Sequence, residues 1–251
     1  MSPNDVVTNP GRHDHFVQLY QDSAYLVDAV ADYIGTGLAR GEGAIIIARP
    51  EHRARFEAQL SRQPCQAGQL VLLDAEEMLA RFMVNAMPAW TSFREVVGGV
   101  IAEMRLHYPT VRAYGEMVDI LWQRENREAA IRLEEYWNEL GRLQTFSLFC
   151  AYRLDPLDSS LYGGPLESVC GAHTHLVPSR EWHGLEDAVK RASEKVLEQP
   201  LADVLLALAE NHRPATLMPH GHATLFWLRQ NMPRTADKVL SELRARDAPA
   251  D

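Results

Sequence analysis

Short apolar runs alternate with amphipathic stretches over about the first 150 residues of the chain. The apolar runs predict strands at residues 15–20, 44–48, 70–74, 111–116 and 146–154. Apolar residues recur at helical spacing between them, which predicts helices over residues 22–40, 50–62, 75–84, 93–104 and 126–143. Residues 117–122 fit either state. Strands that alternate with helices predict an α/β fold, a mostly parallel sheet flanked by helices and joined by right-handed crossovers.

The last third of the chain carries no strand pattern. Helices are predicted there over residues 182–198, 201–211 and 221–246. We therefore expect a flexible N-terminus (1–14), an α/β domain (15–178) and a helical C-terminal extension (179–251). The apolar faces of the extension need a cover, either the α/β core, a second copy in a homodimer, or a partner protein.

The junction between the first strand and the first helix lacks the signature of a nucleotide hydrolase. A phosphate loop needs glycines and a lysine there, because backbone amides and the ammonium group neutralise the phosphates. Residues 20–24 read Tyr-Gln-Asp-Ser-Ala, with neither residue type. The frame of an ATPase without its phosphate chemistry suggests a sensing or scaffolding module, and ATP is not an expected cofactor.

The amino-acid composition restricts the expected cellular location of the protein and its expected binding partners. The chain has 251 residues, 46% of them hydrophobic, and a formal net charge of -9, so nucleic acid is an unlikely partner. Apolar runs fall short of the roughly 20 residues that span a bilayer, and residues 1–14 lack the apolar segment of a signal peptide. Three irregularly spaced cysteines form no disulfide framework. We expect a cytoplasmic protein that does not associate with membranes.

Paired histidines are candidate metal ligands. The sequence has His13-x-His15 and His173-x-His175, and alternate residues of an extended segment point to the same side. His15, His173 and His175 are the candidate metal ligands, and four residues could join them: Glu116, Asp119, Cys150 and Cys170. His15 begins its strand, which could place it at the sheet edge opposite the carboxyl ends of the strands. The alternative is that these histidines cap strands, bond to backbone or face water. A third pair, His220-x-His222, reads as a solvated loop.

Single residues in the same segments are candidates for ligand binding. Glu116 follows Gly115 at a strand end, and it either bonds a ligand, pairs with Arg112 or His15, or satisfies backbone amides at the turn. Cys150 reads as a small core residue.

Cys170 reads as a residue of a glycine-bearing loop beside His173, where a thiolate could form and serve redox sensing. Aromatic residues could wall an apolar pocket, although core packing explains them equally well: Tyr20, Trp122, Tyr136, Trp137, Phe149 and Tyr152. Trp90 and Phe93 are lid candidates.

Six segments, in this order and spacing, resemble the MEDS family of sensory domains, named for methanogen and methylotroph regulators. They are residues 15–22 (HFVQLYQD), 37–48 (GLARGEGAIIIA), 115–122 (GEMVDILW), 133–138 (LEEYWN), 146–152 (FSLFCAY) and 169–175 (VCGAHTH). The resemblance covers roughly residues 13–178. It implies a RecA/KaiC-like fold without the ATP-binding loop and a sensory input role, with small hydrocarbon derivatives as proposed signals in some members.

The leading hypothesis from the sequence is a non-catalytic sensor that binds a small molecule or a partner. The resemblance implies a histidine kinase, a sigma-factor regulator or a DNA-binding module as the output of such domains, and this chain shows no kinase motifs after residue 178. The alternatives are a metal- or thiol-dependent protein that uses His173, His175, Glu116 and Cys170, and a pure protein-interaction module. A bound metal is possible, and the signal itself is unknown.

Overall fold

The computed structural model describes residues 7–63, 65–177, 180–197, 199–212 and 217–247. The chain divides into two compact units. The first comprises Met1–Arg153 and Ala172–Val177, and the second Leu154–Gly171 and Pro178–Asp251. The predicted division into three segments stays a prediction. Residues 1–6 of the predicted flexible N-terminus lie outside the described residues, and Val7 is buried in the core.

The first unit is built on a six-stranded parallel sheet with the order β3-β2-β6-β7-β1-β8. Its strands are β1 (His15–Tyr20), β2 (Gly43–Ala48), β3 (Leu70–Asp74), β6 (Val111–Gly115), β7 (Ser147–Arg153) and β8 (His175–Leu176). β1 and β2 are buried along their whole length, as expected for parallel strands covered on both faces. The predicted α/β class is confirmed, and β8 is a sixth strand that the apolar pattern missed.

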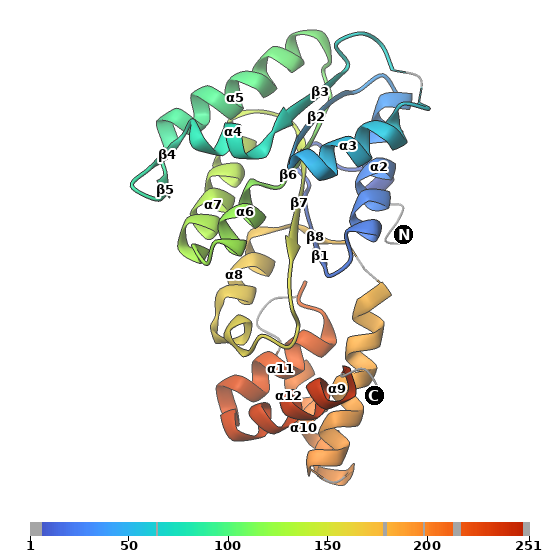
Figure 1. Cartoon of the computed structure of the whole chain (residues 1–251), viewed down its shortest axis with the longest axis vertical. Helices are drawn as coiled ribbons and strands as arrows, with labels where there is room; N and C mark the ends of the chain where they lie inside the picture. Colours follow the sequence, from blue (N-terminus) through green and yellow to red (C-terminus); the bar gives the residue numbers. More distant parts are fainter. Residues whose placement is uncertain (1–6, 64, 178–179, 198, 213–216, 248–251) are drawn as a thin grey trace. The chain divides into compact units, whose positions relative to one another are not determined.

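Helices cover both faces of this sheet (Figure 1). On one face lie α2 (Ser23–Ala39) and α3 (Pro50–Leu60), and on the other α5 (Trp90–His107), α6 (Met117–Gln123) and α7 (Arg127–Leu143). α4 (Ala75–Ala80) and a short hairpin, β4 (Met83–Val84) with β5 (Met87–Pro88), connect β3 to α5. Successive strand residues face opposite sides of the sheet. Phe16 and Phe149 are paired in register and face the same side, where they pack in a core cluster with Tyr33 of α2.

Side-chain caps define where several helices begin. Asp22 accepts a hydrogen bond from the backbone N–H of Ala24 at the start of α2, and Asn126 does the same for Ala129 at the start of α7. Asp74 ends β3 and caps α4. The segment that sequence reasoning left open is helical, because α6 begins directly after Glu116.

The described part of the second unit contains a 3₁₀ helix, η1 (Ser159–Gly163), and five α-helices. These are α8 (Pro165–Ala172), α9 (Arg180–Leu197), α10 (Gln199–Asn211), α11 (His220–Asn231) and α12 (Pro233–Asp247). The helix predicted over 221–246 is two helices, because Pro233 cannot donate a backbone hydrogen bond and begins α12.

The prediction of a solvated loop around His222 is wrong. This imidazole is 3% exposed, its Nδ1 lies 3.0 Å from the Tyr162 hydroxyl, and burial lowers its pKa to about 4. Of the two lid candidates, Phe93 is a core residue, and the half-buried Trp90 stays a candidate. Both lie in the first turn of α5, and Phe93 is fully buried against Trp137. Within the described residues, no helix is long and apolar enough to cross a membrane.

Candidate functional site

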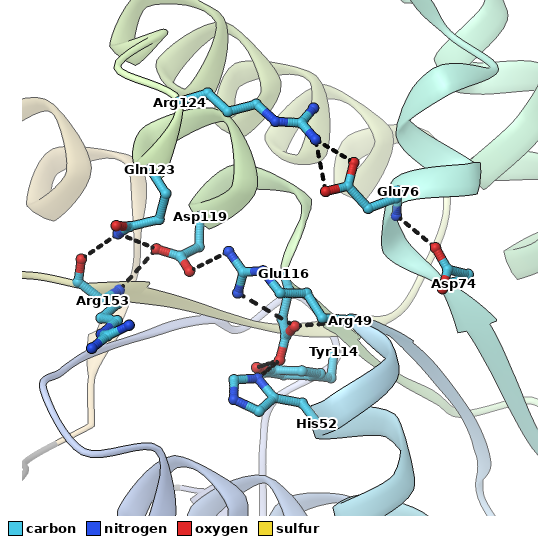
Figure 2. Close-up of polar contacts among 10 residues, drawn as sticks. All are labelled: Arg49, His52, Asp74, Glu76, Tyr114, Glu116, Asp119, Gln123, Arg124 and Arg153. Atoms are coloured by element: carbon cyan, nitrogen blue, oxygen red, sulfur yellow. Dashed lines mark hydrogen bonds and ion pairs between the residues drawn. The ribbon is translucent and has the colours of Figure 1, made fainter.

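Glu116 lies at the carboxyl edge of the sheet, directly after β6, in a network of polar contacts (Figure 2). Its Oε2 accepts a hydrogen bond from the Arg49 backbone N–H at 2.8 Å. Its Oε1 lies 2.6 Å from His52 Nδ1 and accepts a bond from the Tyr114 hydroxyl at 2.8 Å. The predicted pairing of Glu116 with Arg112 or His15 is wrong.

Arg112 lies elsewhere and has other partners. It is fully buried, its Nε lies 2.6 Å from Glu42 Oε2, and it donates to the backbone carbonyl of Tyr33 at 2.8 Å.

Asp119 completes the carboxyl-edge network. Arg49 Nη2 lies 2.8 Å from Asp119 Oδ2, and the Arg153 backbone N–H and the Gln123 side chain donate to Oδ1. Burial raises the pKa of Asp119, against the opposing pull of Arg49. Burial, with the nearby carboxylates of Asp119 and Glu116, likewise raises the pKa of Tyr20. Arg49 thus lies between two carboxylates that are each 1% exposed.

Further along this edge, charged side chains also form ion pairs with one another. Arg124 donates to both carboxylate oxygens of Glu76, at 2.7 and 2.6 Å, and the Asp74 carboxylate accepts from the Glu76 backbone N–H (Figure 2). Trp122 of α6 packs edge to face on Tyr152, and the Arg127 guanidinium lies over its ring. The aromatic candidate Trp122 is therefore a core residue at this edge.

A second group of chemically active side chains lies inside the first unit. We call it the His–Glu–Cys cluster, made of His15, Glu134, Cys150 and His173, all buried. His15 Nε2 lies 3.3 Å from Cys150 Sγ and 3.4 Å from Glu134 Oε2. His173 Nε2 lies 3.4 Å from Glu134 Oε1. The four ligand atoms all lie within 4.8 Å of one another.

The fold brings these side chains together from four elements. His15 begins β1, and Cys150 lies in β7, paired in register with Val17. Glu134 projects from α7, and His173 follows the end of α8. Burial and the proximity of His173 lower the pKa of His15 to about 3. Burial raises the pKa of Glu134, but the two histidines and hydrogen bonds outweigh it and lower the pKa to about 2.

Other predicted site residues lie outside this cluster. His175 is in β8, beside Thr174 and Phe16 and partly exposed. The chain leaves α8 at Ala172 and begins β8 only at His175, so His173 and His175 do not share one extended segment. Cys170 lies in α8 and not in a loop, and burial, with the nearby Glu167, raises the pKa of its thiol to about 12. A thiolate at Cys170 is therefore disfavoured.

A cavity of about 470 Å³ opens at the amino edge of the sheet. It is lined by His13, Asp14, His15, Trp137, Asn138, Gly141, Arg142, Phe146 and Leu148. Trp137 is 2% exposed, and its indole N–H makes no hydrogen bond to any residue that the structure describes. The cavity thus combines aromatic and aliphatic walls with polar and charged lining residues.

Sequence reasoning missed Arg49, His52, Glu134 and Asn138. Glu134 had a detectable signal, because it stands one residue after Leu133 and three before Trp137, within the apolar stripe of a helix. A charge in such a stripe is buried and needs partners. Arg49 and His52 carried no signal of that kind, since their role depends on β2 lying beside β6.

Comparison with known protein families shows which family the chain belongs to. No curated protein and no solved structure gave a significant match. Residues 14–173, more than half of the chain, match the model of MEDS, the methanogen/methylotroph DcmR sensory domain. This agrees with the resemblance carried by the six segments of the sequence. The parallel α/β sheet, the buried cluster and the cavity therefore belong to a member of the MEDS family of sensory domains.

Proposed function

We propose that this protein is a sensor whose α/β unit binds a small molecule and regulates a downstream output without hydrolysing ATP. The observation that carries the proposal is the cavity of about 470 Å³ at the amino edge of the sheet. Its volume is within the range of small-molecule sites, and its lining mixes apolar walls with a few polar groups. The sensory family to which the chain belongs supports the same role.

The amino edge suits ligand binding better than the carboxyl edge does. Ligands of open parallel sheets commonly bind beyond the carboxyl ends of the strands. Here Arg49, Glu116 and Asp119 satisfy one another at that edge. We propose that the fold is a degenerate RecA/KaiC-like one in which these side chains take the place of a nucleotide.

The start of α2 supports the absence of ATP chemistry. A helix N-terminus after the first strand attracts phosphate because its amides and dipole favour negative charge. Here the Asp22 carboxylate accepts the Ala24 N–H at 2.8 Å, so a fixed anion already uses that end of the helix. We propose that ATP fails to bind and that the protein is not an enzyme.

The lining of the cavity suggests the class of signal. Trp137, Phe146 and Leu148 favour an apolar body, and the polar lining residues His13, Asn138 and Arg142 favour a ligand with a hydrogen-bonding group. A small alcohol, ketone or carboxylate has this chemistry. For the output we propose contact with a cytoplasmic signalling protein, such as a histidine kinase or a sigma-factor regulator.

The test is to measure, by saturation-transfer NMR, the binding of a panel of alcohols, ketones and carboxylates with up to six carbons. Gly141→Leu should fill the cavity without a clash, because a Cβ at Gly141 meets no atom within 4 Å. We expect a panel member to bind the wild-type protein and to lose binding in this variant. Native mass spectrometry of the protein as purified would show any retained ligand.

The matched control is Gly99→Leu on α5, where an added Cβ also meets no atom within 4 Å. It should leave binding unchanged. A panel member that binds wild type and Gly141→Leu equally well would exclude the cavity as the sensory site.

A further inference from the structure

The four polar side chains of the His–Glu–Cys cluster converge on one point. A tetrahedral zinc site with bonds of about 2.0 to 2.3 Å places its ligand atoms about 3.3 to 3.8 Å apart. The closest pairs in the cluster are His15 Nε2 to Cys150 Sγ at 3.3 Å, His15 Nε2 to Glu134 Oε2 at 3.4 Å, and Cys150 Sγ to Glu134 Oε2 at 3.7 Å. His173 Nε2 adds a separation of 3.4 Å from Glu134 Oε1. The first three separations join one atom each of His15, Cys150 and Glu134 and are those of ligands on one ion, whereas His173 is measured to the other carboxylate oxygen of Glu134. With one ligand atom from each residue, the four atoms lie within 4.8 Å of one another.

The surroundings orient the ligand atoms inward. Asn138 donates its amide N–H to the Ala172 carbonyl at 2.8 Å, which leaves its Oδ1 facing His15 Nδ1 at 3.0 Å. His15 therefore carries its proton on Nδ1 and turns the lone pair of Nε2 toward Glu134 and Cys150. A histidine that donates its second nitrogen to a fixed acceptor is the usual arrangement of a metal ligand.

Glu134 is oriented in the same way. Its Oε1 accepts a hydrogen bond from the Tyr152 hydroxyl at 2.6 Å, which holds the carboxylate in place. The carboxylate is fully buried, and its described contacts are with Tyr152, Cys150, His15 and His173. Arginine and lysine are not among these described partners. A buried carboxylate needs a compensating positive charge, which a divalent cation would supply.

We infer that His15, Glu134, Cys150 and His173 form a binding site for a tetrahedral divalent cation of the zinc type. Two imidazole nitrogens, one thiolate and one carboxylate suit Zn²⁺ by ligand type and by number. Four protein ligands fill the coordination sphere, so the site is closed, as in structural zinc sites. The Cys150 thiol proton is replaced by the metal and leaves to solvent.

This set differs from the one expected from the histidine pairs. His15 and His173 remain, Cys150 is kept from the possible further ligands, and Glu134 is new. His175 is outside the cluster, in β8 beside Thr174 and Phe16. The inference does not depend on the proposed sensory ligand. The cation is added alone, so a failed metal titration leaves the small-molecule panel unaffected, and the reverse also holds.

The experiment is a titration of the full-length, chelator-treated protein with Zn²⁺ alone, with metal content checked by elemental analysis. We expect one ion per chain. His173→Gln and Cys150→Ala should each weaken binding at least about tenfold, because each removes one of four ligands. The matched controls His175→Gln and Cys170→Ala change the same residue types outside the cluster and should bind as wild type does.

Cobalt gives a readout that needs no variant. Co²⁺ in the wild-type protein should show the intense visible bands of tetrahedral coordination and a thiolate-to-cobalt charge-transfer band in the near ultraviolet. Circular dichroism shows which variants fold. If a variant does not fold, the cobalt spectrum of the wild-type protein still tests the proposed metal site. Folded wild-type protein that binds neither ion would overturn the inference. So would bound cobalt without thiolate absorption, or equal loss of binding in His175→Gln and His173→Gln.

Discussion

At the scale of single residues, Arg49 is expected to stabilise the carboxyl edge of the sheet. It is the guanidinium that lies between Glu116 and Asp119, whose carboxylates are each 1% exposed. Removing one partner of a buried ion pair leaves an uncompensated charge. We expect Arg49→Gln to lower the free energy of unfolding by about 2 to 4 kcal/mol at neutral pH, measured by urea denaturation.

Arg53→Gln is the control for this prediction. Arg53 lies at the end of the first turn of α3, but its Nη1 is 3.9 Å from Asp74 Oδ2, and its side chain is 35% exposed. Its replacement should change the free energy of unfolding by less than about 0.5 kcal/mol. Equal stability of the two variants would show that Arg49 does not hold the carboxyl edge together.

At the scale of elements, α2 comes closest to the Arg112 side chain of β6 at Gly37, a residue without a side chain. A Cβ on Gly37 would lie 2.6 Å from Arg112 Nε and 2.7 Å from its Cδ. The buried Arg112 cannot move away without losing Glu42 and the Tyr33 carbonyl. Gly37→Ala should therefore destabilise the protein by about 1 to 3 kcal/mol, measured by thermal or urea unfolding.

Gly35, two residues earlier in the same helix, gives the opposite expectation. A Cβ there would lie 3.4 Å from the flexible side chain of Gln63, which is ordinary contact. Gly35→Ala should be neutral or stabilising by up to about 1 kcal/mol, because alanine favours the helix. A destabilised Gly35→Ala and an unchanged Gly37→Ala would refute the close approach of Arg112 to α2.

At the scale of the whole molecule, the structure makes the end of the α/β domain testable. Residues Leu154–Gly171 belong to the unit that also contains Pro178–Asp251, and η1 packs against α11. A chain that stops at residue 177 loses α9 to α12, and with them the cover of Leu161 and Tyr162, which are buried in the full chain. We expect this fragment to bind the dye ANS strongly and to unfold at a lower temperature than the full chain.

The full-length protein is the reference in the same assay and should bind little ANS. A fragment with unchanged thermal unfolding and no dye binding would support the domain end near residue 178 that the sequence suggested.

Much of the fold could be predicted because it depends on local patterns. The runs 15–20, 44–48 and 70–74 match β1, β2 and β3 closely, since the strands of a parallel sheet covered by helices are rich in apolar residues. β8 was missed because His175 and Leu176 are too short a segment to show a pattern. The break at Pro233 had a local signal in the proline itself.

The candidate site could be predicted only in part. His15 and His173 were recognised from residue type, and Glu116 from its place at a strand end. Cys150 was among the possible further ligands, but Glu134 was not, because its contact with His15 joins residues far apart in the chain. His175 was wrongly grouped with His173, because the sequence does not show that α8 ends and β8 begins between them.

The sequence by itself determined the α/β class and the membership in the sensory family, because both follow from residue types in local order. Tertiary structure alone decided which side chains meet. The strand order places β2 beside β6, so that Arg49 reaches Glu116 and Asp119. Packing of α7 against β1 and β7 sets Glu134 beside His15 and Cys150. Such contacts depend on how distant segments pack, and local sequence carries no record of that geometry.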